Sequence, residues 1–279
     1  MNDPILGFDE ALAMHVAGDG RLRTTIAPGW DVRGNPHGGY LLALAAKAMG
    51  SVVTQPHPIS IAASYLVPPK PGQADLFVQV IRHGKRQSTA EVRLLQNNEV
   101  CLVATATFGS LPDTPALLLS DDVNRPTSLP QPESCLPRSA LEAAEGGAIN
   151  LHDRIDLRFS PRTGWVTGKP SGIAETEGWL RFVDGREPDP LGLLMFSDGF
   201  PPSLFEARGR AIGHIPTVQL TTHLFALPAP GWVQGRFRTR VQGGSFLDED
   251  GELWDSQGHL VATTRQLALV RPPGPPTPK

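Results

Sequence analysis

The chain is short of cysteine, aromatic residues and net charge, and each shortage excludes a class of protein. Its 279 residues include two cysteines, Cys101 and Cys135, too few for a disulfide framework or a zinc site. Eight histidines follow no metal-ligand spacing, so we expect no metal and no cofactor. Aromatic residues make up 6% and the net charge is −3, with acids and bases interspersed, which argues against a nucleic-acid partner.

Long hydrophobic runs are also missing. No apolar run reaches the roughly 18 residues of a membrane span. The first residues, MNDPILGFDEALAMHVAG, carry early acids and no basic segment of the kind that opens a signal peptide. We therefore expect a cytoplasmic protein without a membrane span. Its hydrophobic content of 40% is enough for one large core or two ordinary ones.

The most distinctive segment, at 32–50, reads VRGNPHGGYLLALAAKAMG. It predicts a helix from about Gly39 to Val53 that is apolar almost all round and therefore buried. Three or four antiparallel strands are expected after it, at about 59–67, 74–82, 87–96 and 100–108, because polar and apolar residues alternate between turns.

Two segments differ from the rest in composition. Residues 111–147 are rich in Pro, Ser and Asp, which is typical of a linker or surface crossover. The last residues, RPPGPPTPK, cannot join a sheet. The predicted division is an N-terminal repeat (1–110), a Pro-rich linker (111–147), a C-terminal repeat (148–271) and a Pro-rich tail (272–279).

The order of elements repeats after the linker. Strand-like segments at about 153–160 and 172–182 precede DPLGLLMFSDGF, a second apolar helix, and a second series of strands. An offset of 158 residues sets Tyr65 against His223 and aligns LVAT at 102–105 with LVAT at 260–263. Two unrelated sets of strands with similar propensities would be the simpler explanation. The shared offset and order favour an internal duplication.

A curved sheet can bury its apolar face around a helix, so the unit belongs to the α+β class. This content resembles the hotdog fold. Two tandem repeats, each a long buried helix wrapped by an antiparallel sheet, would pair into a double hotdog of about ten strands. The chain as a whole resembles the type II acyl-CoA thioesterases. The resemblance rests on the order and spacing of five motifs: HGG at 37–39, SYLVPP at 64–69, FSD at 196–198, PTVQLTTH at 216–223 and GHLVATTRQ at 258–266.

Comparison of the two halves singles out Asp198. With Gly192 set against Gly39, Asp198 faces Ala45, although the rest of its helix is apolar. An unpaired buried carboxylate costs several kcal/mol, on the order of 3 or more, so the residue is either hydrogen-bonded or functional. The alternative is that Asp198 caps a turn before Pro201-Pro202.

Two further polar positions face apolar ones at the same 158-residue offset. Thr217 faces Ile59, and Gln266 faces Phe108. Taken alone, the first is an ordinary strand residue and the second a solvated edge residue. The resemblance to the thioesterases implies that Asp198, Thr217 and Gln266 together hold and activate the hydrolytic water, and that the equivalent site of the first half is inactive.

The start of the first helix is the predicted oxyanion site. A helix N-terminus presents free N–H groups and a positive dipole end, and glycine lets a carbonyl approach closely. We expect the amides of Gly38, Gly39 and Tyr40 to face Asp198 across the pseudo-dimer axis. His37 either joins this site or bonds locally.

The function predicted by the resemblance is hydrolysis of a fatty or related acyl-CoA to free acid and CoA, in lipid metabolism. A non-catalytic acyl-CoA or acyl-thioester binding module and a hotdog hydratase or dehydratase remain as alternatives. The double hotdog satisfies its own pairing, so the chain is expected to be a monomeric pseudo-dimer or a homodimer.

Overall fold

The computed structural model describes residues 6–18, 21–119, 128–145 and 149–272. In the first repeat the strands are β1 (Met14–Val16), β2 (Leu22–Ile26), β5 (His57–Tyr65), β6 (Gly72–Arg82), β7 (Ser88–Gln96) and β8 (Glu99–Gly109). In the second they are β9 (Ile155–Phe159), β10 (Glu175–Phe182), β11 (Thr217–Leu224), β12 (Val233–Gly243), β13 (Phe246–Trp254) and β14 (Leu260–Leu269). A small hairpin joins β3 (Asp31–Val32) to β4 (Asn35–Pro36).

The helices are α1 (Phe8–Ala11), α2 (Gly38–Gly50), α3 (Arg138–Glu145), α4 (Pro190–Phe196) and α5 (Leu204–Arg208). Short 3-10 turns cover Pro132–Ser134, Asn150–Asp153, Trp165–Thr167 and Arg210–Ile212. No helix in these described ranges is long and apolar enough to cross a membrane.

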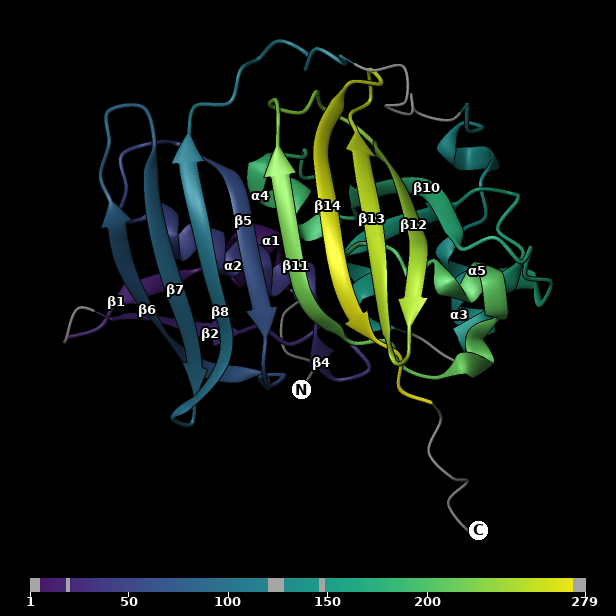
Figure 1. The fold of residues 1–279 in the computed structure, drawn as a ribbon, viewed down its shortest axis with the longest axis horizontal. Coiled ribbons are helices and arrows are strands. Elements are labelled where there is room, and N and C mark those ends of the chain that lie inside the picture. Colours follow the sequence, from purple (N-terminus) through teal and green to yellow (C-terminus); the bar gives the residue numbers. More distant parts are fainter. Residues whose placement is uncertain (1–5, 19–20, 120–127, 146–148, 273–279) are drawn as a thin grey trace.

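One antiparallel sheet runs through both repeats. Its order is β1-β2-β6-β7-β8-β5-β11-β14-β13-β12-β10-β9, so β5 and β11 join the repeats at the centre. Figure 1 shows α2 and α4 together on one side of this sheet. The arrangement confirms the predicted double hotdog. The sheet has twelve strands rather than about ten, because the short strands β1 and β9 extend its two edges.

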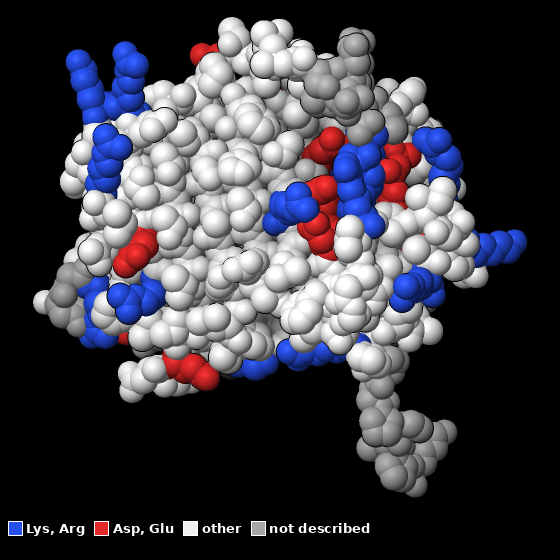
Figure 2. Space-filling model, in the orientation of Figure 1, with Lys and Arg blue, Asp and Glu red and all other residues white. Residues whose placement is uncertain are grey.

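The other face of the sheet is charged mainly in the second repeat. Figure 2 shows acidic and basic side chains gathered over β12 to β14, whereas much of the surface over the first repeat carries neither. Ion pairs join part of this cluster: Asp250 pairs with Arg240 and with Arg265, and Arg265 also pairs with Asp248. These pairs are exposed, so each contributes little stability, about 0–1 kcal/mol.

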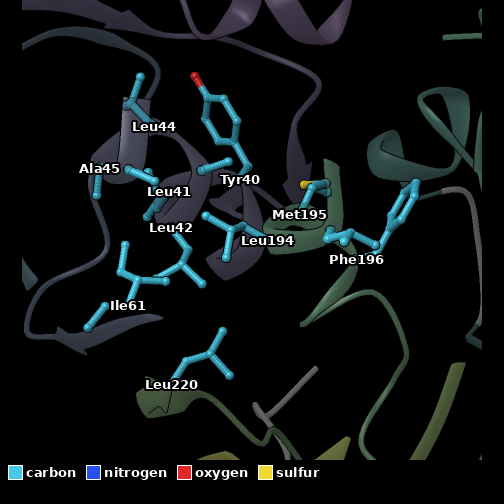
Figure 3. Packing of buried hydrophobic residues seen from close by; sticks show 14 of the residues in the cluster. Tyr40, Leu41, Leu42, Leu44, Ala45, Ile61, Leu194, Met195, Phe196 and Leu220 are labelled. Atoms are coloured by element: carbon cyan, nitrogen blue, oxygen red, sulfur yellow. The ribbon is translucent and has the colours of Figure 1, made fainter. Parts of the chain in front are cut away.

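The predicted buried helix is confirmed as α2. It begins after His37 and is buried along most of its length, with Leu42, Ala45 and Met49 fully enclosed. Leu41, Leu42 and Ala45 lie near Ile61 of β5 and Leu194 of α4 (Figure 3). The small side chains are required because the sheet wraps the helix closely. Enclosing each leucine stabilises the fold by roughly 1.5–3 kcal/mol.

The second repeat departs from the prediction of a long helix. Its helix α4 has seven residues, begins at Pro190 and is capped by Asp189, which accepts a hydrogen bond from the Gly192 amide at 2.7 Å. The helix ends at Phe196 because Pro201-Pro202 follow, and proline removes an amide donor and restricts the residue before it. Asp198 therefore lies just beyond the helix rather than on it.

Bulges in the sheet confirm the duplication and correct its offset. Three register shifts of the first repeat recur 159 residues later in the second: Pro58/Ser60 with Thr217/Gln219, Val80/Arg82 with Thr239/Val241, and Leu94/Leu95 with Leu253/Trp254. The last strand is offset by 160, since Leu94 pairs with Leu102 and Leu253 pairs with Ala262. The turn between β13 and β14 is one residue longer than its counterpart.

The predicted offset of 158 is therefore wrong, and the LVAT match is a coincidence of strand composition. A slip of one residue moves side chains to the other face of a strand. The counterpart of Tyr65 is Leu224 rather than His223, and Thr217 corresponds to Pro58. On the last strand, Gln266 corresponds to Ala106 rather than Phe108.

The predicted domain boundaries stay predictions. The linker 111–147 contains α3 and the turn Pro132–Ser134 in its described part, while 120–127 and 146–147 lie outside the described residues. Of the tail 272–279, only Pro272 is described.

Candidate active site

Asp198, Thr217 and Gln266 meet in one place, although they come from three different elements. Nε2 of Gln266, on β14, donates to Oδ1 of Asp198 at 3.2 Å and makes a close contact with Oγ1 of Thr217 at the start of β11. The Asp198 side chain is 16% exposed, so it is reachable from solvent but mostly enclosed. Gln266 therefore joins the three residues that the resemblance to the thioesterases singled out.

The start of α2 completes the surroundings of Asp198. The backbone amides of Gly38 and Gly39 face its carboxylate and lower the pKa of Asp198. A helix N-terminus favours a negative charge through its free N–H groups and dipole. Because α2 belongs to the first repeat and Asp198 to the second, these groups come together across the pseudo-dimer axis.

Gly39 also explains how the two helices come so close. A Cβ atom on Gly39 would lie 2.2 Å from the carbonyl oxygen of Met195 in α4. Only glycine allows this approach of the two backbones. A Cβ on Gly38 would instead lie 2.6 Å from Oδ2 of Asp198.

His37 precedes the helix and faces the same carboxylate. Its Nε2 lies 2.7 Å from the backbone oxygen of Asp198 and 3.6 Å from Oδ2. A carbonyl oxygen only accepts, so Nε2 carries the proton in this contact. Nδ1 is buried and has no hydrogen-bond partner among the described residues. The structure therefore places His37 in the site.

The amide of Tyr40 is predicted to face Asp198, but the amides that act on this carboxylate are those of Gly38 and Gly39. The Tyr40 side chain lies elsewhere. Its hydroxyl donates to the Ala11 carbonyl oxygen at 2.9 Å and accepts from the Ala27 amide at 3.1 Å. The side chain is fully enclosed, and burial raises its pKa to about 12. Tyr40 thus fastens the N-terminal segment to α2, and its side chain does not reach the cavity described below.

Tyr65 is a site residue that the sequence analysis missed. Its hydroxyl donates to the carbonyl oxygen of Gly38 at 2.8 Å, which is the other end of the peptide unit that presents the Gly39 amide to Asp198. Burial, with the Asp198 charge adding to it, holds the pKa of Tyr65 well above its usual range, so the phenol stays a donor. The sequence does contain a signal for Tyr65. With the corrected offset its counterpart in the second repeat is Leu224, whose side chain cannot hydrogen-bond.

Opposing effects act on the basicity of Asp198. Burial is the largest and raises the pKa of this carboxyl above its usual value. The charge of nearby His37 and hydrogen bonds from Gly39, Gln266 and Gly38 act in the opposite direction. The carboxylate is thus held in place by donors and yet remains more basic than an exposed aspartate.

These residues line a cavity of about 500 Å³. Its wall includes the site residues described above, namely His37, Gly38, Tyr65, Asp198, Thr217 and Gln266. Much of the rest of the wall is apolar and includes the side chains of Leu41, Leu151, Leu157, Phe200 and Phe205. Arg210, His214 and Arg271 line the same cavity and are cationic or can become so. Such a space fits a ligand with an apolar chain and an anionic part.

The polar cluster has the parts of a general-base site. A partly buried carboxylate can take a proton from water, and a hydroxyl and an amide beside it can orient that water. No group of three or more His, Cys, Asp or Glu residues is placed to hold a metal within the described part of the chain.

Two family models match the chain. The acyl-CoA thioesterase N-terminal domain matches residues 26–109, and the acyl-CoA thioesterase C-terminal domain matches residues 132–270. The chain therefore belongs to the acyl-CoA thioesterase family with this two-domain organisation.

Individual relatives and solved structures resemble the chain along most of its length. An uncharacterised protein of Mycobacterium tuberculosis is 31% identical over 262 residues, covering 86% of this chain and 88% of the relative. A Thermobifida fusca protein assigned to thioesterase II superposes with a TM-score of 0.84 at 25% identity, covering 96% of this chain and 98% of that one. An acyl-CoA thioesterase II from Mycobacterium marinum has the same fold, with a TM-score of 0.71 at 17% identity, covering 96% and 99%.

Proposed function

We propose that the protein hydrolyses a fatty or related acyl-CoA to free acid and CoA, with a water activated by Asp198, Thr217 and Gln266. The observation that carries this proposal is the double contact of Gln266, which joins Asp198 to Thr217 at the wall of the cavity. A solvated edge glutamine would have no reason to bridge a buried carboxylate and a hydroxyl.

The proposed reaction begins with water held between the carboxylate, the Thr217 hydroxyl and the Gln266 amide. Asp198 takes a proton as the water oxygen attacks the thioester carbonyl carbon. The tetrahedral intermediate then expels the CoA thiolate by breaking the C–S bond, and the thiolate takes up a proton. A thiolate leaves readily, so no strong general acid is needed.

The amides of Gly38 and Gly39 have a role at two stages of this scheme. Before reaction they hold the Asp198 carboxylate. When Asp198 becomes protonated, negative charge moves to the thioester oxygen, and the same end of α2 then stabilises the oxyanion. A preorganised donor of this kind contributes roughly 2.7–4 kcal/mol to transition-state stabilisation.

The cavity supports a thioester with a phosphate-bearing carrier. Burial lowers the pKa of His214, and the neighbouring Arg271, Arg210 and Arg33 lower it further, which shows a positive potential at this end of the site. The pyrophosphate and 3′-phosphate of CoA are suited to such a potential. The apolar side chains of the cavity suit an acyl chain.

A non-catalytic acyl-CoA binding module is the second candidate. One observation favours it: the amides of Gly38 and Gly39 face the Asp198 carboxylate rather than an open position for an oxyanion. The hydratase or dehydratase alternative has no comparable support, because a dehydratase domain from Pseudomonas fluorescens shares only the fold, with a TM-score of 0.52 at 13% identity.

Thiol release from acyl-CoA substrates of graded chain length tests the proposal. We expect turnover by the wild-type protein and a decrease of about 10²–10⁴-fold in kcat for Asp198→Asn. Asp75→Asn is the matched control, because Asp75 forms ion pairs with Arg21 and Arg23 away from the cavity. Absence of wild-type turnover at every chain length would favour the binding module, and an active Asp198→Asn protein would refute the site.

The proposal includes a cytoplasmic location and a place in lipid metabolism. Cell fractionation with an antibody against the chain tests the first. Lipid profiling after deletion of the gene tests the second, with accumulation of acyl-CoA as the expected result.

A further inference from the structure

A row of polar side chains crosses the inner face of the second repeat. Gln266 on β14 is paired directly with Glu249 on β13, and Glu249 is paired with Thr239 on β12. Side chains at directly opposed positions have Cβ atoms about 4.5–5.5 Å apart. Glu249 is 4% exposed, so a carboxyl lies buried next to the glutamine that contacts Asp198.

The first repeat provides an internal comparison for this row. With the offsets set by the bulges, the counterparts of Gln266, Glu249 and Thr239 are Ala106, Ala90 and Val80, which are paired with one another in the same way. The sheet therefore folds with an apolar row at these positions. Burying a carboxylate is unfavourable unless it is well paired, so Glu249 calls for a reason other than folding.

The contacts of Glu249 lead to the segment that carries Asp198. Its Oε2 accepts hydrogen bonds from the Ser203 amide at 2.7 Å, from the Ser203 hydroxyl at 2.5 Å and from the Thr239 hydroxyl at 3.2 Å. Ser203 is fully buried and lies five residues after Asp198. Glu249 thus fixes one end of the short segment 199–202, and α4 fixes the other.

The charges around both carboxyls are few. Asp198 faces His37 from the start of α2, Tyr65 from β5 and Glu249 from β13, while Thr217 and Gln266 are uncharged. Glu249 faces Ser203, Thr239 and Gln266, also uncharged, and the charge of Asp198. Burial raises the pKa of Glu249, the three donors oppose this, and Asp198 raises it further.

We propose that Glu249 is a positioning residue for Asp198: it anchors the 199–202 segment through Ser203, and its carboxyl is coupled to that of Asp198, so that the ionisation of either opposes the ionisation of the other. Its relevance to turnover rests on the proposed function, whereas the coupling between the two carboxyls does not. The Ser203 amide and hydroxyl hold the segment in place, and the charge of Asp198 disfavours ionisation of Glu249.

The test measures the titration of each carboxyl directly. The full chain is labelled with ¹³C at the side-chain carboxyls of Asp and Glu, and spectra are followed from low to neutral pH. The Asp198 signal is identified by its loss in Asp198→Asn, and the Glu249 signal by its loss in Glu249→Gln. We expect Glu249 to titrate at lower pH in Asp198→Asn than in the wild type, because the charge of Asp198 raises the pKa of Glu249.

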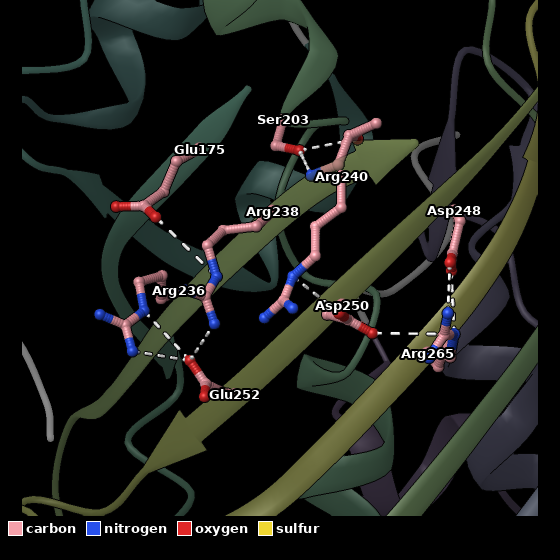
Figure 4. Close-up of polar contacts among 10 residues, drawn as sticks. Glu175, Ser203, Arg236, Arg238, Arg240, Asp248, Asp250, Glu252 and Arg265 are labelled. Carbon is pink, nitrogen blue, oxygen red and sulfur yellow. Dashed lines mark hydrogen bonds and ion pairs between the residues drawn. The ribbon is translucent and has the colours of Figure 1, made fainter. Parts of the chain in front are cut away.

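Coupling is reciprocal in free energy, but it shifts only the carboxyl that ionises second, because the first ionises beside a neutral partner. The Asp198→Asn measurement therefore carries the test, and it holds even if Glu249→Gln does not fold. Asp250→Asn is the matched control. It removes a charge from the next position of β13, on the opposite face, where Asp250 pairs with Arg240 and Arg265 (Figure 4).

The outcomes separate the two proposals. A downward shift of the Glu249 titration in Asp198→Asn, with none in Asp250→Asn, supports the coupling. Unchanged titration of Glu249 in Asp198→Asn overturns it. If the shift is present and the wild type releases no thiol, the proposed function fails and the coupling stands. If thiol is released, the kcat/KM profile of the wild type should carry an inflection at the pH where Glu249 titrates, and Glu249→Gln should lose it, which a merely structural role would not produce.

Discussion

Nε2 of Gln266 donates to Oδ1 of Asp198 at 3.2 Å and also contacts the hydroxyl of Thr217. Gln266 and Asp198 are 68 residues apart in the sequence. One amide therefore fixes the relative positions of a carboxylate and a hydroxyl. Neither oxygen could be held this way by an apolar side chain such as Ala106, the counterpart of Gln266 in the first repeat.

Replacement of Gln266 should therefore reduce turnover selectively. Gln266→Leu leaves two enclosed oxygens without their donor, and a lost contact of this kind costs about 1–3 kcal/mol. We expect kcat for thiol release to fall roughly tenfold to a hundredfold. Gln219→Leu on β11 is the control, since Gln219 is exposed and contacts Ser64. Equal kcat values for the two variants would contradict the role of Gln266.

The neighbouring glycines Gly38 and Gly39 should respond differently to the same substitution. In Gly38→Ala the new methyl group would meet the Asp198 carboxylate, so kcat should fall with little change in Tm. In Gly39→Ala it would meet the Met195 carbonyl oxygen, so α2 and α4 must separate, and the free energy of unfolding should fall by about 1–3 kcal/mol or more. Denaturant titration and thiol release on both variants check this. The reverse pattern would show that the helix contact is more adaptable than the Asp198 carboxylate.

The sequence predicted the parts of the fold whose pattern is local. The buried helix is visible as an apolar segment with a single charge, Lys47, and β5 to β8 are visible as alternating residues between turns. The turn at Asn97 and Asn98 is an example, because both residues adopt positive φ angles that asparagine tolerates. The edge strands β1 and β9 are short and gave no such signal.

Features that depend on pairing across the sheet could not be predicted. The identical LVAT segments suggested a wrong offset, since strand composition says little about register and the bulges are invisible in sequence. Glu249 lies between Asp248 and Asp250 and looks like one more exposed acid. Only its pairing with Gln266 and Thr239 reveals that it points inward. Asp198 could be predicted because a lone acid in an apolar segment contradicts its surroundings.

Asp198 should also make the stability of the protein depend on pH. Its pKa is raised in the folded chain, so the folded state binds this proton at higher pH than the unfolded state. The contribution of this group to stability is then most favourable below the ordinary aspartate range and is lost as pH rises through the folded pKa. Asp198→Asn removes the charge, so we expect its Tm to exceed that of the wild type at neutral pH.

Calorimetry over a series of pH values measures this difference. The advantage of Asp198→Asn in Tm should shrink as the pH falls through the folded pKa of the wild-type carboxyl. Asp75→Asn serves again as the comparison, because its carboxylate is held by two arginines at the surface. A constant Tm difference across all pH values would mean that the charge of Asp198 is not what destabilises the site.

The arginine at the end of the last strand should affect binding of the carrier rather than the chemistry. Arg271 lines the cavity together with Arg210 and His214. A charge-assisted hydrogen bond to phosphate contributes about 1.5–3 kcal/mol, so Arg271→Ala should raise KM for acyl-CoA roughly tenfold or more, with kcat nearly unchanged. The same variant should hydrolyse an acyl-pantetheine thioester, which lacks the phosphates, with unaltered KM. Arg82→Ala, at the exposed end of β6, controls for net charge. A similar increase in KM for both thioesters would show that Arg271 shapes the acyl site instead.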